Sequence, residues 1–295
     1  MNLREIGEDR LLARLMPPGR RLTNVLAATG DDCAVVRLGR ELVLLKTDCV
    51  VEGIHFSKRD DAAAVGWKAM MRPLSDFAAM SGLPQFALVT LVASPETTVT
   101  WTEKLYLGLR KAADKFGVQI VGGETSATHG PAVISVGATG VVENDRWVPR
   151  SGGRAGDELF VTGKLGGSIR GKHLRFVPRI AEARWLTENF SIHAMMDLSD
   201  GLGADLPRLA RASGLGFEID ESAIPRNRGR TIAQAINDGE DYELLFACAR
   251  HDARKLATRW KKTFPKLSLT RIGRLTRHSS AVTRHFRGYV HFKQR

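Results

Sequence analysis

Short apolar runs alternate with amphipathic segments along almost the whole chain, and this alternation restricts the possible folds more than any other feature. The apolar runs have the length of strands, and the segments between them carry the helical spacing of apolar residues. A strand and a helix each bury one face, so such elements pack in layers. The alternation therefore predicts a mixed α/β (α+β) protein with sheets flanked by helices.

The pattern divides into two halves. In the first half we expect strands at 41–48, 86–93, 118–124 and 132–142, and helices at 62–71 and 101–116. In the second half we expect strands at 157–163, 194–201, 216–220, 242–249, 267–275 and 288–292, and helices at 178–190, 204–213 and 251–264. Residues 144–157 concentrate Pro, Gly and charge between the halves. We predict two domains, residues 1–148 and 149–295.

The composition narrows the function classes. The formal net charge of +12 suits either nucleic acid or small anions such as phosphates, but zinc-finger spacing and aromatic RNA-binding signatures are absent. We expect no nucleic-acid partner. No apolar stretch reaches the roughly 18 residues of a membrane span, and the first ten residues do not have the pattern of a signal peptide. The widely spaced Cys33, Cys49 and Cys248 are typical of reduced thiols, so we expect a cytoplasmic protein without a membrane partner.

Acidic residues recur in stretches that are otherwise small or apolar. These residues are Asp31, Asp32, Asp48, Asp76, Glu124, Asp197 and Asp200. Lys46 is the exception to their lack of nearby basic residues. A carboxylate among apolar residues is costly unless it is paired, hydrogen-bonded or bound to a metal. Mg²⁺ prefers such oxygen ligands, and we expect several of these acids to meet beyond strand ends and to hold it.

Each acid also has a simpler interpretation. Ser75, Asp76 and Ser199 are residue types that cap helices, and for any one acid alone a cap is the better explanation. Five segments of the same character together favour a metal site. Gly122 and Gly123 precede Glu124 and would let the backbone approach a phosphate closely.

Eight segments in order resemble the thiamine-monophosphate kinase family. They are TGDDCAV, KTDCVVEGIHF, LSDFAAMSG, VGGETS, VPRSGGRAGD, MDLSDGLGADL, DGEDYELLF and GYVHF. The resemblance runs from Asp31 to Phe292, and DLSDGL with GEDYEL carries most of it. It implies transfer of the γ-phosphoryl group of ATP to thiamine monophosphate, giving thiamine diphosphate. It also implies the two-domain fold of aminoimidazole ribonucleotide synthetase and a homodimer formed through the N-terminal domains.

The resemblance also implies roles for individual residues. Magnesium would be held at the positions of Asp32, Lys46, Thr47, Asp48, Asp76, Glu124, Asp197 and Asp200. Of these, Asp48, Asp76 and Asp200 would be the catalytic acids. ATP would contact Gly122, Gly123, Arg150, Ser199 and Tyr106, and thiamine monophosphate would contact His55, Glu240 and Tyr289.

Three residues depart from the family pattern. Lys46 stands where the family has a small hydroxyl residue, and could fill the place of a metal or point at a phosphate. Pro73 replaces an Asn and is predicted to break the helix that starts at Ala62. Glu124 replaces an Asp and reaches one methylene further. These changes leave two alternatives open: a catalytically altered or inactive paralogue that binds nucleotide or thiamine phosphate, and a synthetase of the same superfamily that acts on another phosphate acceptor.

Overall fold

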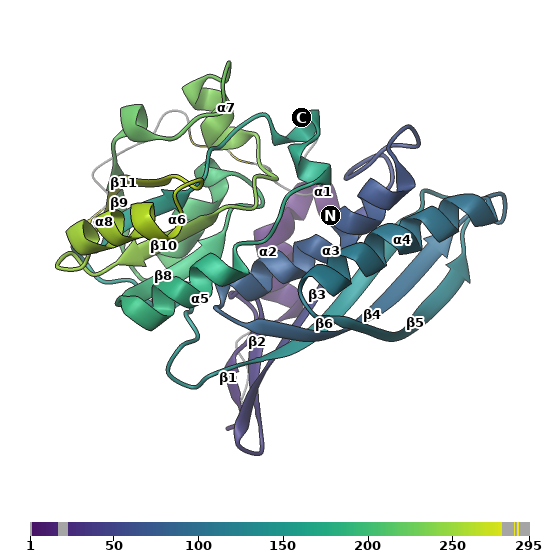
Figure 1. The fold of residues 1–295 in the computed structure, drawn as a ribbon, viewed down its shortest axis with the longest axis horizontal. Helices are drawn as coiled ribbons and strands as arrows, with labels where there is room; N and C mark the ends of the chain where they lie inside the picture. Colours follow the sequence, from purple (N-terminus) through teal and green to yellow (C-terminus); the bar gives the residue numbers. More distant parts are fainter. Residues whose placement is uncertain (1, 17–22, 279–285, 287, 289–295) are drawn as a thin grey trace.

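The strands form two separate sheets, one in each half of the chain (Figure 1). The computed structural model describes residues 2–16, 23–278, 286 and 288. The first sheet has the order β1 (Val25–Ala27), β2 (Ala34–Leu38), β3 (Glu41–Val51), β6 (Val133–Val142), β4 (Leu83–Ala93) and β5 (Gln119–Ala127). Its neighbours are antiparallel except β4 and β5, which are parallel because a helix crosses between them.

Two helices cover one face of this sheet, namely α3 (Ala62–Ala79) and α4 (Val99–Lys115). Each begins at a side-chain cap that satisfies a free backbone N–H, with Asp61 capping α3 and Thr98 capping α4. The two helices cross in close contact at glycines. A Cβ atom on Gly66 would lie 2.0 Å from the carbonyl oxygen of Leu105, so a larger residue would force the helices apart.

No helix of the described residues packs on the opposite face of the first sheet, which we call the open face. Buried and half-buried residues alternate along β6, as expected for a strand with one face against helices. On the open face, Leu45, Phe86, Leu88 and Val121 are exposed. An exposed apolar face of this kind is typical of an interaction surface.

The second sheet is covered on both faces. Its order is β8 (Ile192–Asp197), β10 (Leu244–Cys248), β7 (Glu158–Thr162), β11 (Leu269–Thr276) and β9 (Gly216–Ile219), all antiparallel. One face packs on α5 (Ile180–Asn189) and α8 (Ala253–Thr263), and the other on α6 (Leu202–Ala212) and α7 (Ile232–Asn237). Central strands β7 and β10 are therefore buried along their whole length. This explains their continuous apolar sequence.

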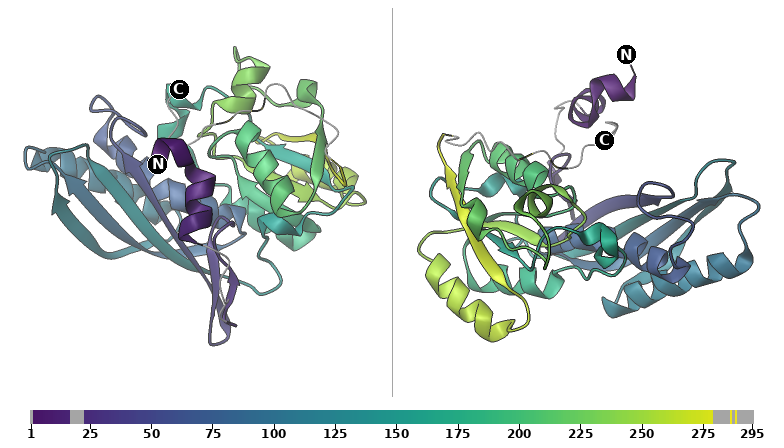
Figure 2. Two further views of the ribbon diagram at one scale, coloured as in Figure 1. Left: turned by 180° about the vertical axis from the view of Figure 1, so that it is seen from behind. Right: turned by 90° about the horizontal axis from the view of Figure 1, so that it is seen from above.

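Short helices complete the described chain. They are α1 (Leu3–Ile6), α2 (Glu8–Leu15), and the 3₁₀ helices η1 (Arg150–Gly152), η2 (Ser168–Arg170), η3 (Lys172–Leu174) and η4 (Glu221–Ala223). Figure 2 shows α1 and α2 outside both sheets. No described helix is long and apolar enough to cross a membrane.

Helix α3 joins the two halves. Trp67 Nε1 donates to the carbonyl oxygen of Phe176 at 2.8 Å, and Ser75 Oγ donates to Asp197 Oδ2 at 2.5 Å. One apolar core continues from α3 and α4 into α5, β10 and α8. The two halves are consequently held in a fixed relation along α3.

The predicted fold class is confirmed, but the expectation for Pro73 is wrong. Helix α3 continues through Pro73 to Ala79. Proline lacks the N–H that would bond to the residue four before it, a loss of about 3 kcal/mol in a helix interior. Because 14 residues of α3 are buried, tertiary packing compensates for that loss.

Several acids also lie elsewhere than expected. Strand β3 continues past Asp48, and β5 continues past Glu124, so neither residue ends its strand. Ser75 and Asp76 lie inside α3 and cap nothing, and the cap of α6 is Gly201 rather than Ser199. Tyr289 and the strand expected at 288–292 lie outside the described residues, apart from Gly288.

Candidate active site

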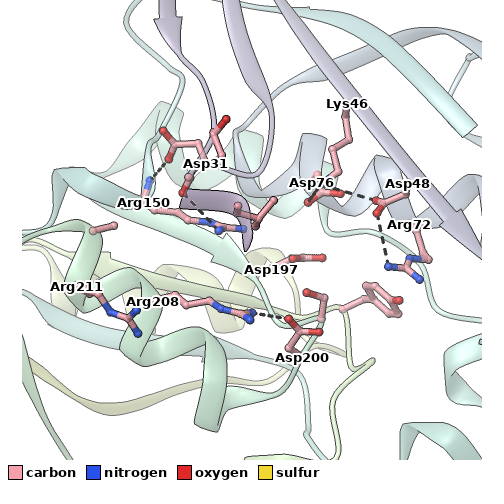
Figure 3. Close-up of a pocket in the computed structure, with 16 residues that line it drawn as sticks. Asp31, Lys46, Asp48, Arg72, Asp76, Arg150, Asp197, Asp200, Arg208 and Arg211 are labelled. Atoms are coloured by element: carbon pink, nitrogen blue, oxygen red, sulfur yellow. Dashed lines mark hydrogen bonds and ion pairs between the residues drawn. The ribbon is translucent and has the colours of Figure 1, made fainter. Parts of the chain in front are cut away.

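A cavity of about 600 Å³ lies where the two halves face each other (Figure 3). Both halves contribute charged residues to its wall, which includes Asp31, Lys46, Asp48, Arg72, Asp76, Arg150, Asp197, Asp200, Arg208 and Arg211. The uncharged lining consists of Leu12 of α2, Thr29, Gly30, Ser199, Ala212 and Tyr242. Carboxylates and cations in one cavity suit a ligand that carries both phosphates and metal ions.

Three buried carboxylates form the centre of this site. Asp32 precedes β2, Asp76 lies on α3 and Asp197 is the last residue of β8. One ligand oxygen from each lies within 4.8 Å of the others. We call these three residues the acidic trio.

Burial and mutual repulsion disfavour the charged forms of two carboxylates in the acidic trio. Burial, and next the charge of Asp32, raise the pKa of Asp197 to about 7. Burial also raises the pKa of Asp76 well above its usual value, with further contributions from Asp48, Asp197 and Asp32. A divalent cation would relieve this repulsion, and the donor set consists of the hard oxygen atoms that Mg²⁺ prefers. The residues present therefore fit the predicted metal.

Cations from the first half contact two of the acids directly. Lys46 Nζ lies 3.0 Å from Asp76 Oδ1 and 3.9 Å from Asp48 Oδ2. Arg72 Nη2 lies 3.6 Å from Asp48 Oδ1 on the other side. Lys46 and Asp48 lie on the same face of the sheet because side chains two apart on a strand share a face. This face is the one covered by α3, since Lys46 contacts Asp76 of that helix.

The second half contributes two further ion pairs. Arg150 donates through Nε to Asp32 Oδ2 at 3.0 Å and through Nη2 to Asp32 Oδ1 at 2.7 Å. Arg208 of α6 pairs with Asp200 and also donates to Asp205 at 3.0 Å. Four of the acids thus have a basic partner in space, although few basic residues lie near them in the sequence. The partners of Asp32 and Asp76 are distant in sequence, namely Arg150 and Lys46, and could not be seen from neighbouring residues.

Seven of the predicted site residues line the cavity: Lys46, Asp48, Asp76, Arg150, Asp197, Ser199 and Asp200. The sequence interpretation missed Arg72, Arg208, Arg211 and Tyr242. A signal for two of them was available. Arg208 and Arg211 are three residues apart on α6, directly after the DLSDG segment, and so share one helical face.

Asp32 is buried beside Arg150 and does not itself line the cavity, and neither do His55 and Glu240. Five more predicted residues lie on other elements. Tyr106 is on α4 and packs against the core, while Thr47, Gly122, Gly123 and Glu124 are on β3 and β5. Thr47 pairs with Gly137, Gly137 with Leu88, and Leu88 with Gly122, which spans four strands. At about 4.8 Å per strand, Thr47 and Gly122 are about 14 Å apart. A Cβ on Gly123 would lie 1.8 Å from the Val89 carbonyl oxygen, so packing against β4 by itself already requires a glycine here.

The two described residues predicted to contact the acceptor meet at a lysine. His55 is buried, and its Nδ1 accepts a hydrogen bond from the Val51 N–H at 3.1 Å. Lys68 Nζ donates to the carbonyl oxygen of His55 at 2.7 Å and to Glu240 Oε1 at 2.7 Å. His55 and Glu240 thus come from different halves of the chain to one place.

Asp241 follows Glu240 in the chain, and its burial leads us to expect that the stability of the protein depends on pH. Burial raises its pKa to about 7, although Gly166 N–H donates to Oδ2 at 2.9 Å and Lys172 lies 3.7 Å from Oδ1. The folded chain therefore binds a proton here that the unfolded chain releases near pH 4. The free energy of unfolding should decrease as the pH rises from about 4 to 8.

The variant Asp241→Asn should remove this contribution. At pH 8 it should be more stable than the wild type by up to about 4 kcal/mol, because one pKa unit corresponds to about 1.4 kcal/mol. Denaturant titrations at pH 5, 6, 7 and 8 would measure the difference. Equal pH dependence in both proteins would show that Asp241 does not titrate in this range.

Comparisons with known proteins agree with this architecture. Residues 30–142 match the AIR synthase related protein, N-terminal domain, and residues 150–284 match the C-terminal domain of the same family. The thiamine-monophosphate kinase of Rhodopirellula baltica is 36% identical over 288 residues, which cover 91% of this chain and 89% of that protein. The thiamine-monophosphate kinase of Aquifex aeolicus is 33% identical, covering 93% of each chain.

The chain belongs to the thiamine-monophosphate kinase family. A solved structure, AaThiL complexed with AMPPCP and TMP, matches with a TM-score of 0.84 and 31% identity, covering 99% of each chain. The resemblance derived from the eight segments is thereby confirmed. In this family member the acidic trio lies at the junction of the two matched regions.

Proposed function

We propose that this protein transfers the γ-phosphoryl group of ATP to thiamine monophosphate, giving thiamine diphosphate and ADP. The acidic trio carries the proposal: its ligand oxygens lie within 4.8 Å of one another, and Asp76 and Asp197 line a cavity that five cationic side chains also line. Family membership names the acceptor. The bond between the γ-phosphorus and the β,γ-bridging oxygen breaks, and an oxygen of the acceptor phosphate forms the new bond.

The residues of the cavity divide into two roles. Asp32, Asp76 and Asp197 would hold Mg²⁺, and Asp48 and Asp200 of the same cavity would supply further carboxylates. When bound, Mg²⁺ would neutralise charge on the transferred phosphoryl group. Arg72, Arg150, Arg208 and Arg211 are suited to the non-bridging phosphate oxygens, because guanidinium groups form paired hydrogen bonds with phosphate. We keep Gly122, Gly123 and Tyr106 as proposed nucleotide contacts.

No general base is required for this reaction. The acceptor is a phosphate that is already an anion near neutral pH, so catalysis consists of alignment and charge stabilisation. The cavity offers acids and cations at fixed positions and no paired nucleophile and base among its lining residues. This composition supports phosphoryl transfer to a phosphate.

An omission assay tests the proposal. The protein is incubated with ATP, MgCl₂ and thiamine monophosphate, and the thiamine phosphates are separated by chromatography. We expect thiamine diphosphate only when all three are present. ATP hydrolysis that does not depend on thiamine monophosphate would instead indicate a synthetase that acts on another acceptor.

One observation favours a second candidate, a binding protein without turnover. Asp32, Asp48, Asp76 and Asp200 each pair with a lysine or arginine of this chain, which could compete with metal. Calorimetry with an ATP analogue separates the candidates. Tight nucleotide binding without Mg²⁺, together with no product in the omission assay, would favour the binding protein.

We further propose a homodimer formed through the open face of the first sheet. Its exposed residues Leu45, Phe86, Leu88 and Val121 supply apolar area, and they surround a shallow hollow lined also by Thr47. Thr47 and Glu124 are both on the open face but several strands apart in one chain. A second copy packed on this face would let Glu124 of one subunit approach Thr47 of the other.

Mixed dimers test this arrangement. Glu124→Gln and Asp76→Asn should each have low activity alone, whereas a mixture of the two variants should regain activity through dimers with one intact site. The expected recovery is about one quarter of the wild-type rate for random pairing of equal amounts, because half the dimers hold one intact site of two. If subunits exchange and no activity returns, both residues serve one site within a single chain.

Two further expectations remain proposals. The division into residues 1–148 and 149–295 follows the change of sheet between β6 and β7. A cytoplasmic location rests on the free Cys33, Cys49 and Cys248.

A further inference from the structure

Lys68 is a charged side chain buried completely in α3. Its relative exposure is 0%, yet it belongs to none of the residue sets considered above for metal, nucleotide or acceptor. Burying an ammonium group is costly unless it is paired and hydrogen-bonded. Burial indeed lowers the pKa of Lys68, and the charge of Glu240 opposes this shift. The buried ammonium group therefore depends on its hydrogen-bond partners, and they depend on it.

The contacts of Lys68 use the donors of its ammonium group fully. Nζ donates to the His55 carbonyl oxygen at 2.7 Å and to Glu240 at 2.7 Å (Oε1) and 2.9 Å (Oε2). An ammonium group has three donors, and all three contacts are short. Lys68 therefore fixes a backbone group of the first half and a carboxylate of the second half at one point.

Glu240 lies in a loop with an unfavourable backbone conformation. Its φ angle is 53°, and that of Tyr242 is 51°, both in the left-handed region. Non-glycine residues rarely occupy that region, because their Cβ atom crowds the backbone there. The conformation is imposed by the surroundings: Glu240 N–H donates to the Ser199 carbonyl oxygen at 2.7 Å, and Ser168 Oγ donates to the Glu240 carbonyl oxygen at 2.5 Å.

The loop that contains Glu240 and Tyr242 adjoins the cavity of the acidic trio. Ser199 and Tyr242 line that cavity, while the Glu240 side chain keeps 20% of its surface exposed. Lys68 and Asp76 lie on the same helix, eight residues apart, which is about 12 Å along the helix axis. One rigid helix thus sets the distance between the acidic trio and the Glu240 carboxylate.

We propose that Lys68 is a positioning residue for the acceptor, which orients the Glu240 carboxylate and the His55 segment toward the cationic, amino-bearing ring end of a thiamine phosphate. This inference rests on the proposed function. A carboxylate suits such a ring because it accepts hydrogen bonds from amino groups and balances positive charge. The ammonium of Lys68 holds one edge of that carboxylate and acts on the acceptor only through it.

The variants Lys68→Met and Glu240→Gln test this role. Each should raise the KM for thiamine monophosphate by about tenfold or more, because each removes a charge-assisted hydrogen bond that fixes the acceptor contact. The KM for ATP should change less than about twofold, since Lys68 does not line the cavity of the acidic trio. Lys58→Met is the matched control, because that lysine side chain is 88% exposed.

The double variant Lys68→Met/Glu240→Gln completes the test. It leaves no unpaired buried charge, so it decides the question even where the single Lys68→Met variant does not fold. We expect its KM for thiamine monophosphate to equal that of Glu240→Gln within about twofold, as for two residues that act as one unit. Multiplied effects, or equal changes in the KM for both substrates, would overturn the inference.

Calorimetry distinguishes this inference from the proposed function. If the wild type binds thiamine monophosphate but forms no thiamine diphosphate, the proposed function fails. A tenfold loss of thiamine monophosphate binding in Lys68→Met would still support the positioning role. Unchanged binding of thiamine monophosphate in Lys68→Met would overturn the inference while leaving the kinase assignment intact.

Discussion

Replacing Asp76 with Asn should lower the rate of thiamine diphosphate formation by a hundredfold or more without lowering the stability of the fold. Asp76 belongs to the acidic trio and also contacts Lys46 at 3.0 Å. Removing one charge from a site that stabilises a phosphoryl-transfer transition state is expected to cost several kcal/mol, and 1.36 kcal/mol is tenfold in rate. Stability should not fall, because burial and the neighbouring acids raise the pKa of this carboxyl and make its charged form unfavourable, and Lys46 keeps Asp48 as a partner at 3.9 Å.

Two measurements on the same preparations test this contrast. Initial rates at several Mg²⁺ concentrations give the loss of activity, and thermal unfolding gives the stability. Asp145→Asn is a suitable control, because Asp145 is exposed in the loop after β6. A near-normal rate for Asp76→Asn would remove this residue from the site. A large fall in melting temperature would show that its role is structural.

Lys46→Met should make activity depend more strongly on Mg²⁺. The ammonium of Lys46 lies between Asp76 and Asp48, at 3.0 and 3.9 Å, and burial is opposed by these charges so that its pKa is raised. It thus neutralises charge that a cation would otherwise balance. Without it, the carboxylates of Asp76 and Asp48 repel each other unless Mg²⁺ balances their charge, so we expect the rate at low Mg²⁺ to fall by about a hundredfold or more.

Recovery by the metal distinguishes the two roles left open for Lys46. If its ammonium stands in the place of a cation, high Mg²⁺ should restore much of the lost rate in Lys46→Met, and calorimetry should detect weaker Mg²⁺-dependent binding of an ATP analogue at low Mg²⁺. If Lys46 instead contacts a phosphate, the loss should persist at every Mg²⁺ concentration. Full activity at low Mg²⁺ would contradict both roles.

Much of the fold could be predicted because its elements have local signals. The strands around β7 and β10 are continuous apolar runs, and α4 shows helical spacing, so their types and approximate bounds follow from the sequence. Pro73 was misjudged because propensity is local, whereas the packing of α3 involves both halves of the chain.

Part of the site could be predicted because it, too, has local signals in the sequence. Asp76 and Asp197 have small or apolar neighbours in the sequence, which predicts that they are buried, and they do lie together with Asp32. The ion pair of Arg150 with Asp32, and that of Lys68 with Glu240, join residues more than 100 positions apart. No local pattern reports such pairs. The separation of Glu124 from the cavity likewise depends on strand order, which the alternation of elements does not determine.

The position of a labelled phosphate tests the central claim most directly. The wild-type protein is incubated with MgCl₂, thiamine monophosphate and ATP labelled with ³²P in the γ-phosphate, and the products are separated. We predict that the label moves to the terminal phosphate of thiamine diphosphate, and that the transfer stops when Mg²⁺ is chelated. Label found in inorganic phosphate, or retained in ATP by a folded protein that binds both substrates, would contradict the account.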